Sequence, residues 1–300
     1  MGFVDLQVNG YAGVDFNQDD LSGEDLHRAC EQMAADGVES FLATIWTERL
    51  DQMERRLRRL VELRHQDELV EAMVPGFHVE GPFLNEQDGF RGAHPIDAIM
   101  PADVDAARRL LDAAGGLTRI FTLAPDRDQG LKVTRLLAKA GITVSAGHCD
   151  PTIDELDAAI DGGLSMFTHL GNGCPMQMHR HDNIIQRVLS RSDRLRLCFI
   201  ADGAHVSFFA LRNYLRAAGI DRCALVTDAM TATGLGPGRY QIGRWNLAIG
   251  EDLVARAPDG SHLVGSAITM DRARRNLIDQ VGLSAADANR LTSTTPREYL

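Results

Sequence analysis

The sequence predicts an α/β protein folded as a (β/α)₈ TIM barrel, and three features of the chain point to this fold class. Short apolar runs rich in β-branched and aromatic residues alternate about eight times with longer amphipathic runs. The short runs are mostly apolar on both faces, as strands buried in a parallel sheet are. At 300 residues, the chain has the length of one such barrel. We therefore expect one catalytic barrel domain over residues 1–300.

Each unit of the predicted barrel begins with a strand. The eight expected strands are residues 3–8, 40–45, 73–79, 119–123, 143–146, 165–168, 197–201 and 224–227. The runs between them have helical spacing, and most end at glycine, a common signal for the end of a helix. The expected helices are residues 24–35, 51–64, 102–114, 131–140, 152–160, 183–189, 208–218 and 267–281. A doubly wound open sheet is the alternative, but the first strand is not followed by the G-x-G-x-x-G turn that such sheets usually carry.

Two longer segments interrupt this alternation. Residues 85–101 form a long loop after the third strand, and residues 229–265 follow the eighth. The second segment contains short β runs at 240–242, 247–249 and 253–255, so we expect a hairpin insertion there. Long loops in compact domains are usually functional, and both would lie at the carboxyl ends of the strands, where barrels place their active sites.

Charge and cysteine content exclude several classes of function. The net charge is -11, from 42 acidic residues against 31 lysines and arginines, which disfavours nucleic acid or an anionic membrane as partner. The five cysteines are scattered and form no C-x-x-C pair, as expected for reduced thiols. The start of the chain does not resemble a secretory signal, and no apolar run approaches the ~20 residues of a membrane helix. We expect a soluble cytoplasmic protein.

Four residues with metal-binding or acid–base chemistry follow four of the expected strands: Glu80, His148, His169 and Asp228. Because the carboxyl ends of the strands meet at one face of a barrel, these side chains should converge on one site. Two histidines and one carboxylate form a ligand set that suits Zn²⁺ with an open fourth position. Asp228 would then be a carboxylate beside the attacking water, free to transfer its proton.

Each of these residues alone has a simpler explanation. A single histidine at a strand end is more often a structural residue, and Asp228 alone could cap a helix, so only their joint placement favours a metal site. His78 lies two residues before Glu80 and should point to the same side of the strand, supporting the site without binding metal. The first strand carries Gln7 and Asn9 where many metal-dependent hydrolase barrels have His-x-His. Since amides are poor ligands for Zn²⁺, we expect one metal ion rather than two.

Longer stretches of the sequence resemble one enzyme family. In chain order they read DLQVNGYAGVDFN, HVEGPFLN followed by GAHP, SAGHCDPT, THLGNGCP, IADGAHV, LVTDAM and LVGSAITM, and they span residues 5–270. Together they resemble the N-acetylglucosamine-6-phosphate deacetylases of the amidohydrolase superfamily. The resemblance implies a metal-dependent hydrolase barrel that removes acetyl from an N-acetyl amino sugar phosphate, with one divalent ion, Zn²⁺, as cofactor.

The resemblance also implies roles for individual residues. Glu80, His148 and His169 match the metal ligands, Asp228 matches the general acid/base, and His94 matches the histidine that helps the metal polarise the amide carbonyl. The positions that match substrate contacts are Ala93, Asn172, Gly173, Arg180, His205, Leu263, Val264 and Gly265.

Some of these matches carry further implications. Arg180 falls where the family has a phosphate-binding arginine. His205 matches a histidine that reaches substrate across a dimer interface, so the resemblance implies a homodimer. Residues 263–265 match the loop that closes over the sugar. Family members usually carry a flanking β-sandwich as well, which this chain is expected to lack because its first strand begins at Phe3.

The sequence leaves alternatives for the substrate. After His169 the chain departs from the family and includes MQMHRHDNIIQR, where the family typically has an arginine followed by an acid, proline and glycine. Arg180 and its two flanking histidines could therefore be a solvated turn. The substrate could then be a non-phosphorylated acetamido sugar, an N-acyl amino acid or a cyclic amide. A non-catalytic sugar-binding barrel is the remaining alternative, although simple binding does not require the four strand-end residues together.

Overall fold

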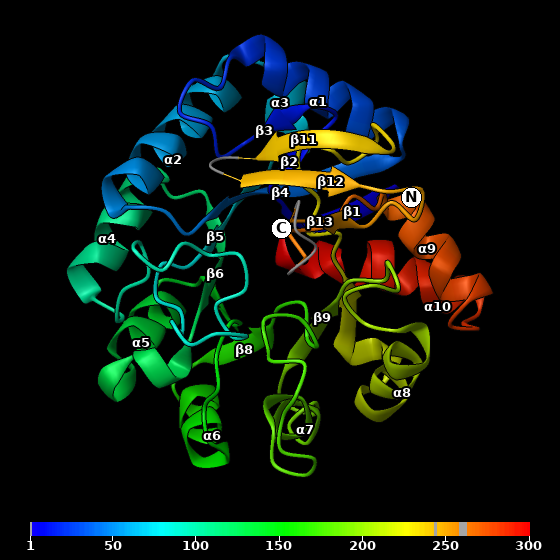
Figure 1. Cartoon of the computed structure of the whole chain (residues 1–300). Helices are drawn as coiled ribbons and strands as arrows, with labels where there is room; N and C mark the ends of the chain where they lie inside the picture. The colour runs from blue at the N-terminus through cyan, green and yellow to red at the C-terminus, as the bar shows by residue number, and fades with distance from the viewer. Residues whose placement is uncertain (1, 243–244, 258–262) are drawn as a thin grey trace.

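Eight parallel strands form one sheet in the order β1-β4-β5-β6-β7-β8-β9-β10, and helices surround it as an outer layer (Figure 1). This computed structural model describes residues 2–242, 245–257 and 263–300. The strands of the sheet follow one another in chain order, without the reversal that a doubly wound sheet shows. The predicted (β/α)₈ barrel is therefore confirmed, and the open-sheet alternative is wrong.

Every expected strand overlaps one strand of the sheet. The observed strands are β1 (Phe3–Val8), β4 (Val38–Trp46), β5 (Gly76–Glu80), β6 (Thr118–Leu123), β7 (Thr143–Ala146), β8 (Leu164–Phe167), β9 (Arg196–Phe199) and β10 (Cys223–Leu225). The third strand begins later than expected, because the preceding residues form a short helix, α3 (Glu68–Met73). The carboxylate of Asp67 accepts hydrogen bonds from the first amides of this helix, which explains its start.

Backbone and side-chain contacts close the barrel between its first and last strands. Just beyond β1, the amide of Asn9 donates to the carbonyl of Ala229 over 2.7 Å. Deeper in the seam, the buried carboxylate of Asp5 accepts hydrogen bonds from the amide (3.2 Å) and the hydroxyl (2.5 Å) of Thr227. These contacts fix the chain on both sides of Asp228.

The outer helices follow the strands and each buries one face. They are α1 (Gly23–Ala35), α2 (Leu50–His65), α4 (Val104–Ala113), α5 (Lys132–Lys139), α6 (Ile153–Asp161), α7 (Ile184–Leu189), α8 (Phe208–Ala218), α9 (Met270–Asp279) and α10 (Ala285–Asn289). At the start of α6, Thr152 and Glu155 form the capping box that the sequence predicts. Helix α9 begins three residues later than expected, since the hydroxyl of Thr269 caps its first turn.

The barrel interior combines an apolar cluster, against which Tyr299 and Leu300 pack, with polar side chains. Its apolar cluster consists of Val4, Leu6, Leu42, Ile120, Met166, Cys198, Ile200, Ala224 and Val226. Above this cluster, the ring of His78 lies 3.0 Å from the carbonyl of Leu6 and 2.7 Å from the hydroxyl of Thr122. Burial lowers the pKa of His78 to about 4, so its ring is neutral near pH 7.

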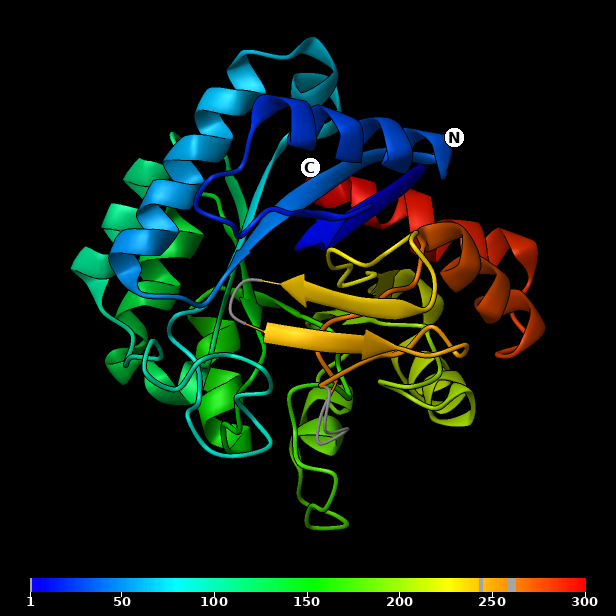
Figure 2. The same ribbon diagram turned by 45° about the horizontal axis from the view of Figure 1, so that its top comes forward.

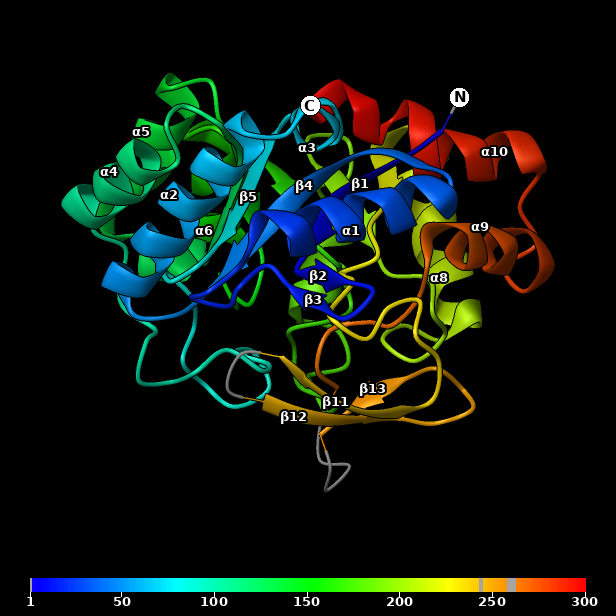
Figure 3. The same cartoon turned by 90° about the horizontal axis from the view of Figure 1, so that it is seen from above.

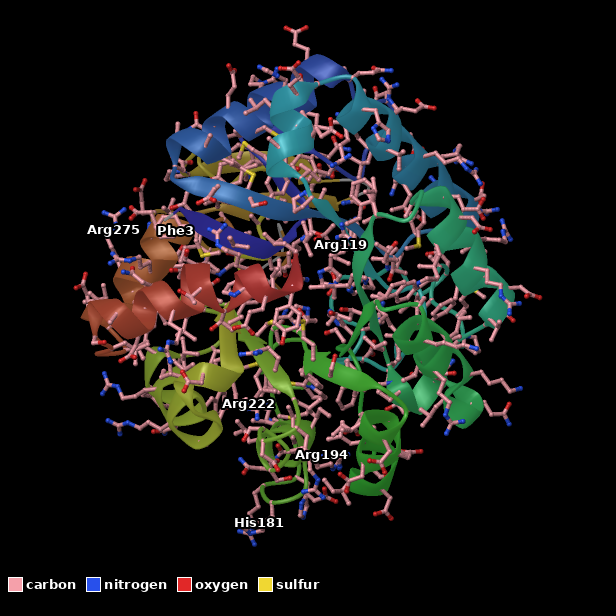
Figure 4. All side chains as sticks on the ribbon, turned by 180° about the vertical axis from the view of Figure 1, so that it is seen from behind. Phe3, Arg119, His181, Arg194, Arg222 and Arg275 are labelled. Carbon is pink, nitrogen blue, oxygen red and sulfur yellow. The ribbon has the colours of Figure 1, made fainter. Side chains whose placement is uncertain are left out.

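Two antiparallel additions follow the barrel strands. After β1, β2 (Gly10–Tyr11) pairs with β3 (Val14–Asp15). In the segment after β10, β11 (Gly238–Ile242), β12 (Trp245–Ile249) and β13 (Ala255–Arg256) form a three-stranded sheet. Figures 2 and 3 place β11 and β12 at the end of the barrel away from the chain termini, and Figure 4 views the other end, where Phe3 begins β1. Within the described residues, no helix has both the length and the apolar character needed to cross a membrane.

Candidate active site and metal centre

Most residues that the sequence assigns to the site line one small cavity at the carboxyl ends of the barrel strands. The cavity has a volume of about 50 Å³ and opens to the surface. Its lining residues are Asn9, Trp46, Glu80, Gly92, Ala93, His94, His148, Asn172, His205, Asp228, Met230, Leu263, Val264 and Gly265. Of the predicted site residues, His169, Gly173 and Arg180 do not line it.

Three of the predicted residues form a metal-binding arrangement. Glu80 ends β5, His148 lies two residues beyond β7, and His169 lies two residues beyond β8. Ligand atoms of all three lie within 4.8 Å of one another. The Oε1 atom of Glu80 is 2.9 Å from Nε2 of His169 and 3.6 Å from Nε2 of His148. All three side chains are buried and close enough to bind one ion.

The surrounding hydrogen bonds leave suitable atoms available for a metal. Nδ1 of His148 lies 2.8 Å from the carbonyl of Phe90, so it carries the proton and leaves Nε2 as a ligand. Nε2 of His169 faces Glu80, while its buried Nδ1 has no hydrogen-bond partner among the described residues. One carboxylate and two imidazoles are donors that Zn²⁺ and similar divalent ions prefer. The residues therefore fit a divalent metal ion.

The charges at this cluster suit a bound cation. Burial alone would raise the pKa of Glu80, but hydrogen bonds with His148 and His169 hold it well below its usual value, so Glu80 is an anion. Burial, assisted by the neighbouring His148, lowers the pKa of His94 to about 3. Nε2 of His94 is 3.2 Å from Nε2 of His148. His94 is therefore a neutral imidazole beside the cluster, able to donate a hydrogen bond to a carbonyl oxygen.

Asp228 is the second carboxylate in the cavity and lies three residues beyond β10. It accepts hydrogen bonds from Nδ2 of Asn9 (2.7 Å) and Nε2 of Gln7 (3.2 Å). Burial and the negative charge of Glu80 raise the pKa of Asp228 to about 6. A carboxylate that titrates near neutral pH can both take up and release a proton, as a general acid/base must.

The side-chain amide of Gln7 connects the two carboxylates. Its Nε2 lies 3.0 Å from Oε1 of Glu80 as well as 3.2 Å from Oδ1 of Asp228, and its Oε1 accepts a hydrogen bond from the hydroxyl of Thr168 (2.6 Å). The sequence indicates only that Gln7 and Asn9 are poor metal ligands. The structure shows that both side chains donate hydrogen bonds to Asp228. The sequence offered one indication of a role at the site, because both residues occupy positions where other hydrolase barrels carry metal ligands.

His148, His169 and Asp228 share an uncommon backbone conformation. Their φ angles are +51°, +32° and +52°, in the left-handed region that residues other than glycine rarely adopt. Such residues persist only where the surrounding structure holds them, and they cluster at active sites. All three lie just beyond the end of a strand, so the turn at each strand end positions a functional side chain.

Gly173 lies against the ring of His148, which explains why a predicted substrate position does not line the cavity. A methyl group on Gly173 would come within 2.7 Å of Nδ1 of His148, and the residue has a φ of +60°. We expect Gly173→Ala to displace this ring and to weaken metal binding about 10- to 100-fold, as loss of a metal site's outer support typically does. Equilibrium dialysis with Zn²⁺ measures the affinity.

Gly219→Ala is the matched control for this prediction. Gly219 has a similar positive φ of +84°, but no other residue lies within 4 Å of the added methyl group in the part of the chain that the structure describes. Both variants place an alanine at a positive φ, and only Gly173→Ala touches the metal site. Equal Zn²⁺ affinity in the two variants would contradict the proposed contact.

His205 lines the cavity of its own chain. Its Nδ1 lies 2.6 Å from Oδ2 of Asp202, whose other oxygen accepts hydrogen bonds from the amides of Ala204 and His205 (2.9 Å each). Burial alone would lower the pKa of His205, but the negative charge of Asp202 raises it. Asp202 thus favours the protonated form of the His205 ring at the cavity. The resemblance implies contact across a dimer interface, whereas here His205 reaches the cavity without a partner.

Arg180 lies away from the cavity, in the loop between β8 and α7. Its side chain is exposed, and no hydrogen bond or ion pair with another described residue holds it. Its neighbour His181 lies at the outer edge of the molecule in Figure 4. The phosphate-binding role of Arg180 stays a prediction.

The cavity also contains residues to which the sequence assigns no role. Trp46 ends β4, Gly92 precedes Ala93 in the loop after β5, and Met230 follows Asp228 by two residues. For Trp46 the only signal was its place at a strand end, where an aromatic residue is more often part of the core.

Several enzymes resemble this chain over its full length. N-acetylglucosamine-6-phosphate deacetylase from Bos taurus is 35% identical over 100% of this chain and 73% of its own length. N-acetylgalactosamine-6-phosphate deacetylase from Escherichia coli O157:H7 is 30% identical over 99% of this chain and 77% of its own length. A variant of N-acetyl-D-glucosamine-6-phosphate deacetylase from Mycobacterium smegmatis, solved in complex with N-acetyl-D-glucosamine-6-phosphate, superimposes with a TM-score of 0.88 at 30% identity, covering 100% of this chain and 77% of that one. No protein-family model matches the chain.

Two comparisons and the geometry of the site now agree. Identity of about one third extends over the whole chain, the barrel is shared with a solved deacetylase, and a buried cluster of two histidines and one glutamate stands at its mouth. The protein therefore belongs to the N-acetylglucosamine-6-phosphate deacetylase family.

Proposed function

We propose that this protein hydrolyses the acetamide of an N-acetyl amino sugar 6-phosphate to acetate and the amino sugar phosphate, with N-acetyl-D-glucosamine 6-phosphate as the favoured substrate. The observation that carries this proposal is the meeting of the Glu80–His148–His169 cluster and Asp228 at the carboxyl ends of the barrel strands. The named activities of the relatives include both N-acetylglucosamine 6-phosphate and N-acetylgalactosamine 6-phosphate. The relatives therefore support an amino sugar phosphate as substrate more strongly than they support one particular epimer.

Glu80, His148 and His169 would hold one divalent ion, which we propose to be Zn²⁺ because of the donor set. When bound, such an ion supplies a Lewis acid for the amide carbonyl and lowers the pKa of water. An acetamide is unreactive, so its hydrolysis needs both effects.

The protein's own groups would handle the protons and the developing charge. Asp228 takes a proton from the attacking water as the oxygen bonds to the carbonyl carbon. His94 donates a hydrogen bond to the carbonyl oxygen as negative charge develops there. Asp228 then gives the proton to the nitrogen, because an amine is too basic to leave unprotonated, and the C–N bond breaks. Asn9 and Gln7 hold the Asp228 carboxylate in place during both transfers.

We assign the sugar to the side of the cavity formed by Asn172, His205 and residues 263–265. Gly173 lies against the ring of His148 and stays a predicted substrate contact. Arg180 is proposed to bind the phosphate. The competing possibility is a non-phosphorylated substrate, which is favoured by the exposed position of Arg180 outside the cavity. The homodimer that the family resemblance implies stays a prediction. A cytoplasmic location belongs to the proposal because the five cysteines are unpaired, as in reducing compartments.

Turnover of N-acetylglucosamine with and without the 6-phosphate tests the phosphate assignment. We expect Arg180→Ala to lower kcat/KM for the phosphorylated sugar about 10- to 150-fold, since a hydrogen bond to a charged group contributes about 1.5–3 kcal/mol. The rate on the unphosphorylated sugar should not change. Arg275→Ala, which removes an exposed arginine from α9, is the control. If the wild-type enzyme hydrolyses both sugars at equal rates, the non-phosphorylated alternative is favoured.

A further inference from the structure

We propose that Trp46 forms the wall of the acyl subsite and restricts this enzyme to acetyl groups, an inference that rests on the proposed deacetylase function. Trp46 is the last residue of β4, and its Cα pairs with that of Glu80 in the register of β4 and β5. Paired residues on neighbouring strands point to the same face of a sheet. The indole therefore enters the barrel mouth beside the Glu80 carboxylate, and both residues line the cavity.

The indole packs against the ring of His94, and hydrogen bonds hold the backbone of the strand end that carries it. Its ring centroid lies 5.6 Å from that of His94, with an angle of 59° between the planes. The backbone amide of Trp46 donates to Oδ1 of the buried Asn17 (3.1 Å), whose Nδ2 donates to the carbonyl of Thr44 (3.0 Å). Trp46 thus lies at a strand end that is held by hydrogen bonds, and its ring packs against His94, the residue proposed to contact the carbonyl oxygen.

The chemistry of the cavity fixes the orientation of an amide within it. The nitrogen must face Asp228, because this carboxylate returns the proton to the leaving amine. The carbonyl oxygen must lie near the metal ligands and His94. The sugar is bonded to the nitrogen, so it extends toward the loops after β8, β9 and β10, which contribute Asn172, His205 and residues 263–265.

The acyl chain is then the one remaining substituent on the carbonyl carbon, and it points toward the wall opposite the sugar loops. The lining residues contributed by β4 and the loop after β5 are Trp46, Gly92, Ala93 and His94. Gly92 and Ala93 take up little space, whereas the indole covers a large part of the wall. We expect a methyl group to fit between them, whereas a longer chain must displace the indole from its contact with the ring of His94.

An acyl-length series tests this assignment. The substrates are N-acetyl-, N-propionyl- and N-butyryl-glucosamine 6-phosphate, compared by kcat/KM in the wild-type enzyme and in Trp46→Ala, Trp46→Ile and Trp46→Phe. One methylene in an apolar pocket changes kcat/KM about 10- to 200-fold, so the wild-type enzyme should lose at least tenfold at each added carbon. Trp46→Ala and Trp46→Ile should raise the propionyl-to-acetyl ratio at least tenfold, and Trp46→Phe should raise it less. Leu263→Ala, on the sugar side, should leave this ratio unchanged.

The outcomes separate the subsite from the enzyme's function. Wild-type enzyme that accepts butyryl as readily as acetyl overturns the subsite without any variant, so a variant that fails to fold cannot hide the result. The subsite is also overturned if the variants fold, hydrolyse the acetyl substrate and keep the wild-type propionyl-to-acetyl ratio. That result is expected if Trp46 contacts the sugar instead, because the KM values for all three substrates would then rise together. Failure of the wild-type enzyme to hydrolyse any of the three amides would instead contradict the proposed function itself.

Discussion

Asp228→Asn is expected to lower kcat about 10²- to 10⁴-fold while the protein keeps its fold and its metal, because positioned proton transfer contributes rate enhancements of this size. Asparagine has nearly the same shape and can still accept the hydrogen bonds from Asn9 and Gln7 through Oδ1. It cannot take a proton from water or return one to the amine. The loss should therefore appear in kcat more than in KM, measured as acetate released from N-acetylglucosamine 6-phosphate.

The control for this variant is Asp88→Asn. Asp88 lies in the loop after β5, is highly exposed, and pairs only with Arg91 among the described residues. Asp88→Asn is the same chemical change as Asp228→Asn and lies near the same end of the barrel, but Asp88 does not line the cavity. An Asp228→Asn enzyme that retains more than a tenth of wild-type turnover would remove Asp228 from the mechanism.

His94→Ala is expected to lower kcat about 10²- to 10³-fold, which is the usual effect of removing one donor to a developing oxyanion. The ring of His94 is neutral and lies beside the metal cluster, so it can donate a hydrogen bond to the carbonyl oxygen without adding a competing charge. His94→Asn retains a side-chain N–H donor and should recover part of the rate. Metal content should stay at the wild-type level in both variants, because His94 is not one of the assigned ligands.

His181→Ala provides the comparison for His94. His181 is an exposed histidine in the loop before α7, and its loss should leave kcat within about twofold of the wild-type value, as surface substitutions usually do. If His94→Ala instead loses the metal along with its activity, His94 is a ligand and its assignment as a hydrogen-bond donor is wrong.

The barrel could be predicted because most strand residues are buried on both faces, so the strands stand out in the sequence as largely apolar runs. The same geometry explains why Glu80, His148, His169 and Asp228 could be grouped without any contact information. Residues that follow parallel strands must meet at one end of the barrel, and the chain repeats this arrangement four times.

The supporting contacts of the site could not be predicted in this way. The pairing of β1 with β4 shifts between Asp5 and Val8, so regular alternation does not reveal that Gln7 reaches both Glu80 and Asp228. The role of Trp46 depends equally on register, because only its pairing with Glu80 distinguishes it from an ordinary core aromatic.

Short helices and long loops account for the other differences between the predicted and the observed structure. Helices α3 and α10 have six and five residues, too few for an amphipathic period to stand out from the flanking sequence. The position of Arg180 depends on the conformation of a loop, and sequence spacing says little about how far such a loop extends from the strand end.

The central claim is that one ion held by Glu80, His148 and His169 acts with Asp228 to hydrolyse an acetamide. The most direct test removes metal with a chelator and then titrates the protein with Zn²⁺ while acetate release from N-acetylglucosamine 6-phosphate is followed. We predict that activity returns in proportion to added Zn²⁺ and reaches its maximum at one ion per chain, and that His148→Ala recovers neither binding nor turnover. Full activity in the metal-free protein, or a maximum reached only at two tightly bound ions, would contradict the claim.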